Sequence, residues 1–447
     1  MKLLHKFYIG FALLLLLICL FFGAVAILSF FKVDYFTDMM SFQQARPFHV
    51  SGALFWIITA ATGGILFYKN EIVAQDRWSK YLLTGFMTLM MLTITTILIS
   101  YAFEQYGGRE YWEFPPFYNL LLLISWLLLM VGFFVPIIRY ASSKPVYIWM
   151  WSAGILFFLF TFIEQNLWHF AWFRNSFVKE MTIQWKSNGS MVGAWNQMIY
   201  GTGIYLMVKI SGDEKIAQSG KAYFAFFLGL TNLVFNWGHH IYNIPSASWI
   251  RGISYGISMT EWLLFISIIQ SFKIKLDETK KFSHLITYRF LIASEVWIFL
   301  NLLLALLMSI PAINRYTHGT HITVAHAMGT TIGINTMILL ASFSYMLKLD
   351  TIKKLSNRFL YLTGFWGTQI SLLVFWVALI VAGLFKGLNM AKVPALSFAE
   401  TMQSVYPALK VFMYSGFALM ISLSIIVIYL LRSLRTLIIE EATQKLG

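Results

Sequence analysis

The stretch YIGFALLLLLICLFFGAVAILSFF, residues 8–31, contains no charged side chain. An apolar run of about 20 residues lets an α-helix cross the roughly 30 Å hydrocarbon core of a bilayer. The run is too long for a signal-peptide core, and no small-residue cleavage site precedes Lys32. We therefore expect it to remain in the protein as a transmembrane helix.

Further apolar runs of similar length follow at short intervals. They cover residues 47–68, 81–104, 116–138, 147–169, 187–209, 221–243, 252–272, 286–310, 322–347, 358–385 and 404–431. The chain is 59% hydrophobic and 12% charged, whereas soluble domains have roughly 45–50% apolar and about 25% charged residues. The sequence predicts an all-α polytopic membrane protein of about twelve transmembrane helices, forming one transmembrane domain over residues 1–447.

Basic residues divide the loops into two sets. The two termini and every second loop carry about 22 of the 33 Lys and Arg residues. Cytoplasmic loops carry the excess of Lys and Arg in membrane proteins. We therefore expect an inner-membrane protein of a bacterium with both termini in the cytoplasm. The same bias explains the net charge of +14, so we expect lipid rather than nucleic acid around the chain.

Residue types limit the metal chemistry that the chain can support. The single cysteine, Cys19, excludes an internal disulfide and any cysteine-based iron–sulfur or metal site. Metal ligands must therefore come from His, Met, carboxylate or amide side chains.

Besides His169, six of the nine histidines fall at the predicted outer ends of helices. They are His49, His239, His240, His318, His321 and His326. Ionisable residues inside a membrane are costly and are functional candidates by default. An isolated histidine more often only bonds a neighbouring helix, but that reading suits the adjacent pair His239 and His240 poorly. Two imidazoles about 100° apart on a helix can both reach one metal.

The tenth run contains Ala325-His326-Ala327-Met328-Gly329. Residues two apart on a helix differ by about 200°, so His326 and Met328 are expected to face opposite sides. One helix can then present an axial ligand to each of two hemes. Plain packing is the alternative for Met328.

Five ordered segments resemble the catalytic subunit of the heme–copper oxidase superfamily, in its nitric oxide reductase branch. They are Arg46-Pro47-Phe48-His49-Val50, Gly108-Arg109-Glu110-Tyr111, Gly238-His239-His240-Ile241-Tyr242, Ser258-Met259-Thr260-Glu261, and the segment from Thr317 to His326. The resemblance covers nearly the whole chain. It implies two b-type hemes, a non-heme iron (copper in the oxidases) and a calcium ion.

The resemblance also implies residue roles. His49 would ligate the low-spin heme and His326 the high-spin heme. His239 and His240 would hold the non-heme metal, with Glu261 as a glutamate near the active site. Glu110, in an outer loop with Arg109 and Glu113, would help to hold calcium between heme propionates.

Two departures from the family pattern affect these roles. Asn188 stands where the family usually has a third metal-binding histidine, and Val192 where it has a glutamate. Asn188 would be a weaker, neutral ligand, or alternatively only the N-cap of the sixth helix. Met328 replaces the second histidine of a His-x-His motif, and a His49/Met328 pair would raise the potential of the low-spin heme.

The resemblance implies reduction of NO to N2O, with electrons from a separate cytochrome c-type subunit. NO dismutation to N2 and O2 is a second interpretation, because Asn188 and Val192 would replace the usual histidine and glutamate of the non-heme metal site. Oxygen reduction and a non-catalytic heme-binding paralogue are further readings. A transporter lacks support, since the chain shows no repeat and no paired broken helices. Glu164, near the end of the fifth helix, is a candidate for proton uptake from outside.

Overall fold

The computed structural model describes residues 2–31, 40–74, 76–140, 144–235, 245, 247–257, 270, 283–351, 355–392, 394 and 396–443. This part of the chain is almost entirely helical and contains no strand, only an isolated bridge between Arg109 and Trp112. The all-α prediction is therefore confirmed. The chain divides into two compact units, residues 1–142, 343–373 and 413–447, and residues 143–342 and 374–412. The prediction of one transmembrane domain stays a prediction.

The first unit begins with four long helices. They are α1 (Lys2–Phe30), α3 (Phe42–Ile72), α4 (Arg77–Ala102) and α5 (Tyr118–Tyr140). Helices α1 and α3 pack closely: a Cβ atom on Gly52 would lie 3.0 Å from the backbone nitrogen of Cys19. His5 Nε2 donates to the Gly63 carbonyl at 2.8 Å. The interior is rich in fully buried aromatic side chains such as Trp56 and Tyr68.

The second unit holds most of the candidate residues. Its helices are α6 (Val146–Gln165), η1 (Asn166–His169), α7 (Ala171–Arg174), α8 (Phe177–Ser211), α9 (Lys215–Gln218), α10 (Gly220–Phe235), α13 (Leu285–Ser309), α14 (Pro311–Thr317), α15 (His321–Met328) and a π-helix, η3 (Gly329–Thr336). η3 continues directly into α16 (Met337–Met346), which crosses into the first unit, and η4 (Leu349–Thr351) belongs to the first unit. Helix α8 packs on α6, where a Cβ atom on Gly154 would lie 2.7 Å from the Ala194 carbonyl oxygen.

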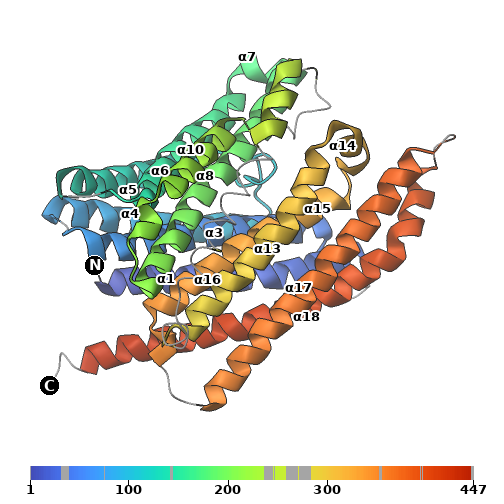
Figure 1. The fold of residues 1–447 in the computed structure, drawn as a ribbon. Coiled ribbons are helices and arrows are strands. Elements are labelled where there is room, and N and C mark those ends of the chain that lie inside the picture. Colours follow the sequence, from blue (N-terminus) through green and yellow to red (C-terminus); the bar gives the residue numbers. More distant parts are fainter. Residues whose placement is uncertain are drawn as a thin grey trace. The chain divides into compact units, whose positions relative to one another are not determined.

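The last two helices, α17 (Leu355–Met390) and α18 (Phe398–Thr443), run side by side and belong to both units (Figure 1). A Cβ atom on Gly367 would lie 2.5 Å from the Ser422 hydroxyl oxygen. Near the other end of the pair, Asn389 Nδ2 donates to Ser404 Oγ at 2.7 Å.

Nine helices in the described part of the chain are long and apolar enough to cross a membrane. Ten of the predicted runs coincide with described helices. Only the first part of the run 221–243 is described, as α10, and the run 252–272 lies mostly outside the described residues. The total of twelve stays a prediction. The sixth helix was expected from residue 187 but begins at Phe177. Helix α8 is not among the nine, because its middle carries many polar residues.

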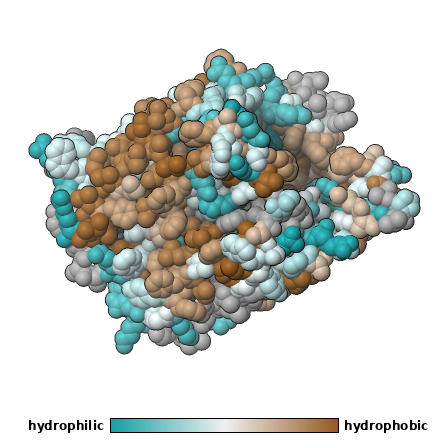
Figure 2. All heavy atoms as spheres, turned by 90° about the horizontal axis from the view of Figure 1, so that it is seen from above, coloured by the Kyte–Doolittle hydropathy of each residue, from teal (hydrophilic) through white to brown (hydrophobic). Residues whose placement is uncertain are grey.

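Exposed apolar side chains follow one face of α17. They recur every three or four residues and are Trp366, Ile370, Leu373, Val377, Val381, Leu384 and Leu388. Hydrophobic side chains also cover much of the surface visible in Figure 2. Such a surface suits hydrocarbon rather than water, which supports the membrane assignment.

Candidate functional site

The imidazole of His49 is held between two helices of the first unit. Ser41 caps α3 and forms a capping box with Gln44, so His49 lies in the second turn of α3. Its Nδ1 donates to the Cys19 carbonyl on α1 at 2.8 Å. A Cβ atom on Gly23 would lie only 2.7 Å from the same Nδ1, so a larger residue here would force the ring to move. A backbone bond from one ring nitrogen orients the other toward a metal, and Nε2 is the nitrogen that remains.

A short ordered turn between α4 and α5 presents two carboxylates. Arg109 N donates to the Trp112 carbonyl at 3.0 Å, and Trp112 N donates to the Arg109 carbonyl at 2.8 Å. Tyr111 at the tip has a left-handed φ of 71°. A Cβ atom on Gly108 would collide with the Trp112 carbonyl oxygen at 1.6 Å. The Gly108-Arg109-Glu110-Tyr111 segment thus forms a defined turn rather than a free loop.

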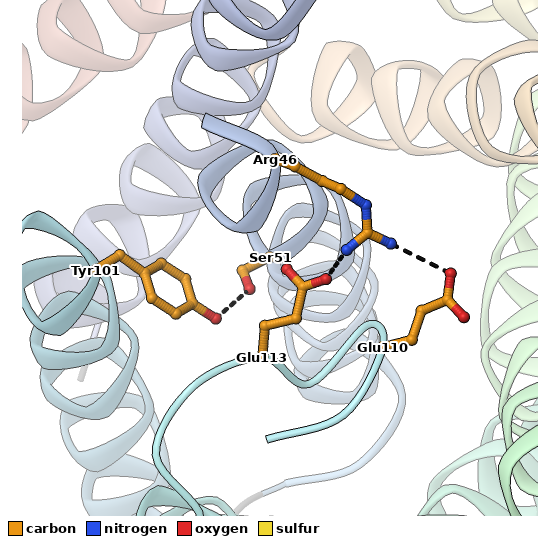
Figure 3. A network of polar contacts seen from close by, with 5 residues as sticks. All are labelled: Arg46, Ser51, Tyr101, Glu110 and Glu113. Atoms are coloured by element: carbon orange, nitrogen blue, oxygen red, sulfur yellow. Dashed lines mark hydrogen bonds and ion pairs between the residues drawn. The ribbon is translucent and has the colours of Figure 1, made fainter. Parts of the chain in front are cut away.

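Arg46 pairs with both carboxylates that this turn presents (Figure 3). Its guanidinium bonds Glu113 and lies 3.2 Å from Glu110. The Glu113 side chain is 13% exposed and the Glu110 side chain 44% exposed. Burial, and next the charge of Glu110, raise the pKa of Tyr111. The sequence placed these carboxylates beside Arg109, and the structure adds Arg46 as a cation that pairs with both of them.

The calcium role of Glu110 stays a prediction. No group of three or more His, Cys, Asp or Glu side chains suited to a metal occurs among the described residues. Arg46 already supplies a positive charge to Glu110 and Glu113. The sequence signal that could have identified Arg46 was the segment Arg46-Pro47-Phe48-His49, which places the arginine one turn before His49.

His326 and Met328 lie in the last turn of α15, and both side chains are half-buried. The Thr320 hydroxyl caps α15 by accepting from Ile322 N at 3.2 Å. His326 Nδ1 is buried and has no hydrogen-bond partner among the described residues. Its carbonyl accepts from Asn301 Nδ2 and from Thr330 Oγ1, each at 3.1 Å. A buried ring nitrogen without a described partner is compatible with a role in binding a heme or a metal.

Asn188 lies in the middle of α8, eleven residues after the first residue, Phe177. The N-cap reading is therefore wrong, because the helix begins three turns earlier. The Asn188 side chain is buried, and neither its Nδ2 nor its Oδ1 has a partner among the described residues. Leaving a buried polar group unbonded costs about 1–3 kcal/mol. A metal or another bound group would remove that cost, so the site fits a ligand.

Other buried polar groups on α8 also lack described partners. They are Ser190 Oγ, Trp195 Nε1 and Gln197 Oε1. Trp195 is two turns from Asn188 and shares its helix face, whereas Ser190 and Gln197 lie on the opposite face. The polar character of α8 thus extends beyond the single residue that sequence reasoning selected.

The remaining predicted ligands, His239, His240 and Glu261, lie outside the described residues, and their roles stay predictions. Val192 supplies no carboxylate one turn after Asn188. Glu164, at the end of α6, forms an ion pair with Lys186 of α8 at 2.5 Å. Sequence reasoning selected Glu164 but not its partner.

Comparison with known proteins places the chain in a family. A family model described as cytochrome c and quinol oxidase polypeptide I matches residues 4–418. The chain therefore belongs to the heme–copper oxidase subunit I family. Members are membrane oxidoreductases that bind hemes and a copper- or iron-containing metal centre. The family prediction drawn from the motifs is confirmed.

Two relatives and one solved structure illustrate the range of this family. The chain is 21% identical to a subunit of nitric oxide reductase from Stutzerimonas stutzeri, over 92% of this chain and 90% of that protein. It is 23% identical to cytochrome c oxidase subunit 1 of Rhodobacter capsulatus, over 84% and 74%. A cryo-EM structure of a heme–copper terminal oxidase dimer shares the fold with a TM-score of 0.73 and 15% identity, over 97% and 84% of the chains.

Proposed function

We propose that this chain is the catalytic subunit of a membrane nitric oxide reductase. It would convert two NO, two electrons and two protons into N2O and water, with a cytochrome c-type subunit as electron donor. The similarity to a nitric oxide reductase over 92% of the chain carries this proposal. The five ordered segments, which resemble the reductase branch, also support it over an oxidase.

The described ligand candidates fit the cofactors of the family. His326 would hold the high-spin heme, and His49 with Met328 the low-spin heme. His239, His240 and Asn188 would hold the non-heme iron. His326 and Asn188 each have a buried side-chain atom without a described hydrogen-bond partner, which supports a ligand-binding role. When bound, the hemes and the iron supply redox chemistry and the positions at which NO binds.

The chain's own residues orient those ligands and provide charge. The Cys19 carbonyl accepts a hydrogen bond from the His49 ring and fixes its orientation, and Gly23 leaves the space that the ring occupies. Arg46 supplies a cation one turn before His49, tied to Glu113. The Glu164–Lys186 pair offers ionisable groups on α6 and α8 for proton uptake.

Asn188 and Val192 would change the redox balance of the second metal. A neutral amide and an alkyl group in place of an imidazole and a carboxylate remove one negative charge. A less negative site favours ferrous over ferric iron. We therefore expect a higher potential at this iron than in a site with the full family ligand set.

NO dismutation to N2 and O2 is a second candidate. The specific observation in its favour is the altered metal site at Asn188 and Val192. A low-spin heme with a raised potential would donate electrons poorly to the active site. Dismutation needs no net external electrons, so it would tolerate such a heme.

Product analysis on the purified full-length protein tests these proposals. Heme and metal content would be measured first, then the gases formed from isotopically labelled NO with and without a reductant. Electron-dependent N2O supports the reductase. Labelled N2 with O2 supports the dismutase, and oxygen consumption supports an oxidase. Heme binding without turnover would indicate a non-catalytic paralogue, and absence of heme would refute the cofactor assignment.

A further inference from the structure

A buried asparagine on α13 contacts the main chain of the proposed heme ligand. Asn301 is fully buried, and its Nδ2 donates to the His326 carbonyl at 3.1 Å and to Thr330 Oγ1 at 2.8 Å. Thr330 Oγ1 in turn donates to the same carbonyl at 3.1 Å. Both hydrogens of one amide group are thus used on the turn that carries His326.

This contact lies where the helix changes its geometry. Helix α15 ends at Met328, and the π-helix η3 begins at Gly329. Widening from an α-helix to a π-helix interrupts the regular backbone bonding of the residues at the junction, and such segments often occur at functional sites. The Asn301 amide and the Thr330 hydroxyl supply side-chain donors to the carbonyl at that junction.

Helix α13 also packs closely against the same segment. A Cβ atom on Gly329 would lie 2.2 Å from Asn301 Oδ1. One turn earlier on α13, the Trp297 ring lies so close to Gly333 that a Cβ atom there would be 2.5 Å away. The backbone at Gly329 and Gly333 of η3 therefore packs directly against two side chains of α13.

We propose that Asn301 is a positioning residue for His326. By holding the His326 carbonyl, it sets the orientation of the imidazole toward the high-spin heme. This inference rests on the proposed function, because it requires His326 to be the axial ligand. It adds a residue of α13 that no motif in the sequence indicated.

The test is Asn301→Asp, which keeps the shape of the side chain and replaces the NH2 donor with an oxygen. The ferrous full-length protein would be examined by resonance Raman spectroscopy for the iron–histidine stretching band of the high-spin heme. We expect the variant band to move to lower frequency and to broaden, because the ligand loses its fixed orientation. Thr330→Val, which removes the second donor to the same carbonyl, should produce a smaller shift in the same direction.

Asn335→Asp is the matched control. Asn335 is also fully buried, lies near the other end of η3, and donates to Asn196 Oδ1 at 3.1 Å. It should leave the band unchanged. An unchanged band in both Asn301→Asp and Thr330→Val would overturn the inference, as would an equal shift in the control. Absence of the band in the unmodified protein would refute the axial role of His326 itself, and if Asn301→Asp fails to bind heme, Thr330→Val alone decides.

Discussion

At the scale of single residues, the proposed site depends on two effects: space for a ligand side chain, and a buried polar group without a hydrogen-bond partner. Gly23 shows the first effect and Asn188 the second. The glycine leaves space for the His49 ring, and the asparagine amide has no described hydrogen-bond partner inside its helix. Each leads to a substitution with a defined outcome.

Gly23→Ala should displace the His49 imidazole. The added methyl group would lie 2.7 Å from Nδ1, and overpacking of this kind typically costs about 1–3 kcal/mol. We expect the low-spin heme signal in reduced-minus-oxidised spectra to fall or disappear. Gly220→Ala is the control, because nothing lies within 4 Å of the added atom. A normal low-spin heme in Gly23→Ala would contradict the assignment of His49.

Asn188 can be tested by substitution in two directions. If the amide binds iron, Asn188→Leu should lower the non-heme iron content of the purified protein, and Asn188→His should raise it toward one non-heme iron per chain. If the amide is only a buried group without a partner, Asn188→Leu should instead stabilise the protein by about 1–3 kcal/mol with unchanged iron. Metal analysis and thermal unfolding of the two variants separate these outcomes.

Met328→His tests the ligand of the low-spin heme. His/Met ligation gives a higher heme potential than ligation by two histidines. We expect the substitution to lower the midpoint potential by about 0.1–0.3 V, within the roughly 0.8 V range that axial ligands span. Spectroelectrochemical titration measures this change. An unchanged potential would show that Met328 only packs in α15.

At the scale of elements, the turn between α4 and α5 is attached to α3 through Arg46. The two ion pairs differ in exposure, since the Glu113 side chain is 13% exposed and that of Glu110 44% exposed. Exposed pairs contribute about 0–1 kcal/mol and are screened by salt, whereas removing a buried partner leaves an uncompensated charge.

Glu113→Gln should therefore lower the thermal unfolding temperature by several degrees at both low and high salt. Glu110→Gln should change it little, and any difference should disappear at roughly 0.5 M salt. Thermal unfolding of both variants in detergent is the measurement. Equal effects of the two substitutions would contradict the difference in burial.

At the scale of the whole molecule, the prediction concerns orientation. The distribution of Lys and Arg predicts both termini in the cytoplasm and the Glu110–Glu113 turn outside. A fluorescent protein that folds only in the cytoplasm should be bright when fused to the carboxyl terminus. A periplasm-dependent phosphatase should be active when inserted at Gly107 and inactive at the terminus. The reverse pattern would refute this topology.

Much of the fold could be predicted because a bilayer leaves few choices. Apolar runs of helical length must satisfy their backbone hydrogen bonds internally, so composition alone identifies spanning helices. Helix ends were less predictable. The start of α8 was misplaced from Phe177 to residue 187 because its first turns mix polar and apolar residues. The π-helix η3 has no simple sequence pattern and was not expected.

The sequence by itself determined the membrane class, the all-α fold and the family, since apolar runs and ordered motifs are local along the chain. Tertiary structure alone decided that Arg46 pairs with Glu113, that Gly23 makes room for His49, and that Asn301 holds the His326 turn. The partners in each of these contacts are separated by 25 to 67 residues. They meet only through the packing of helices, which no local pattern of residues records.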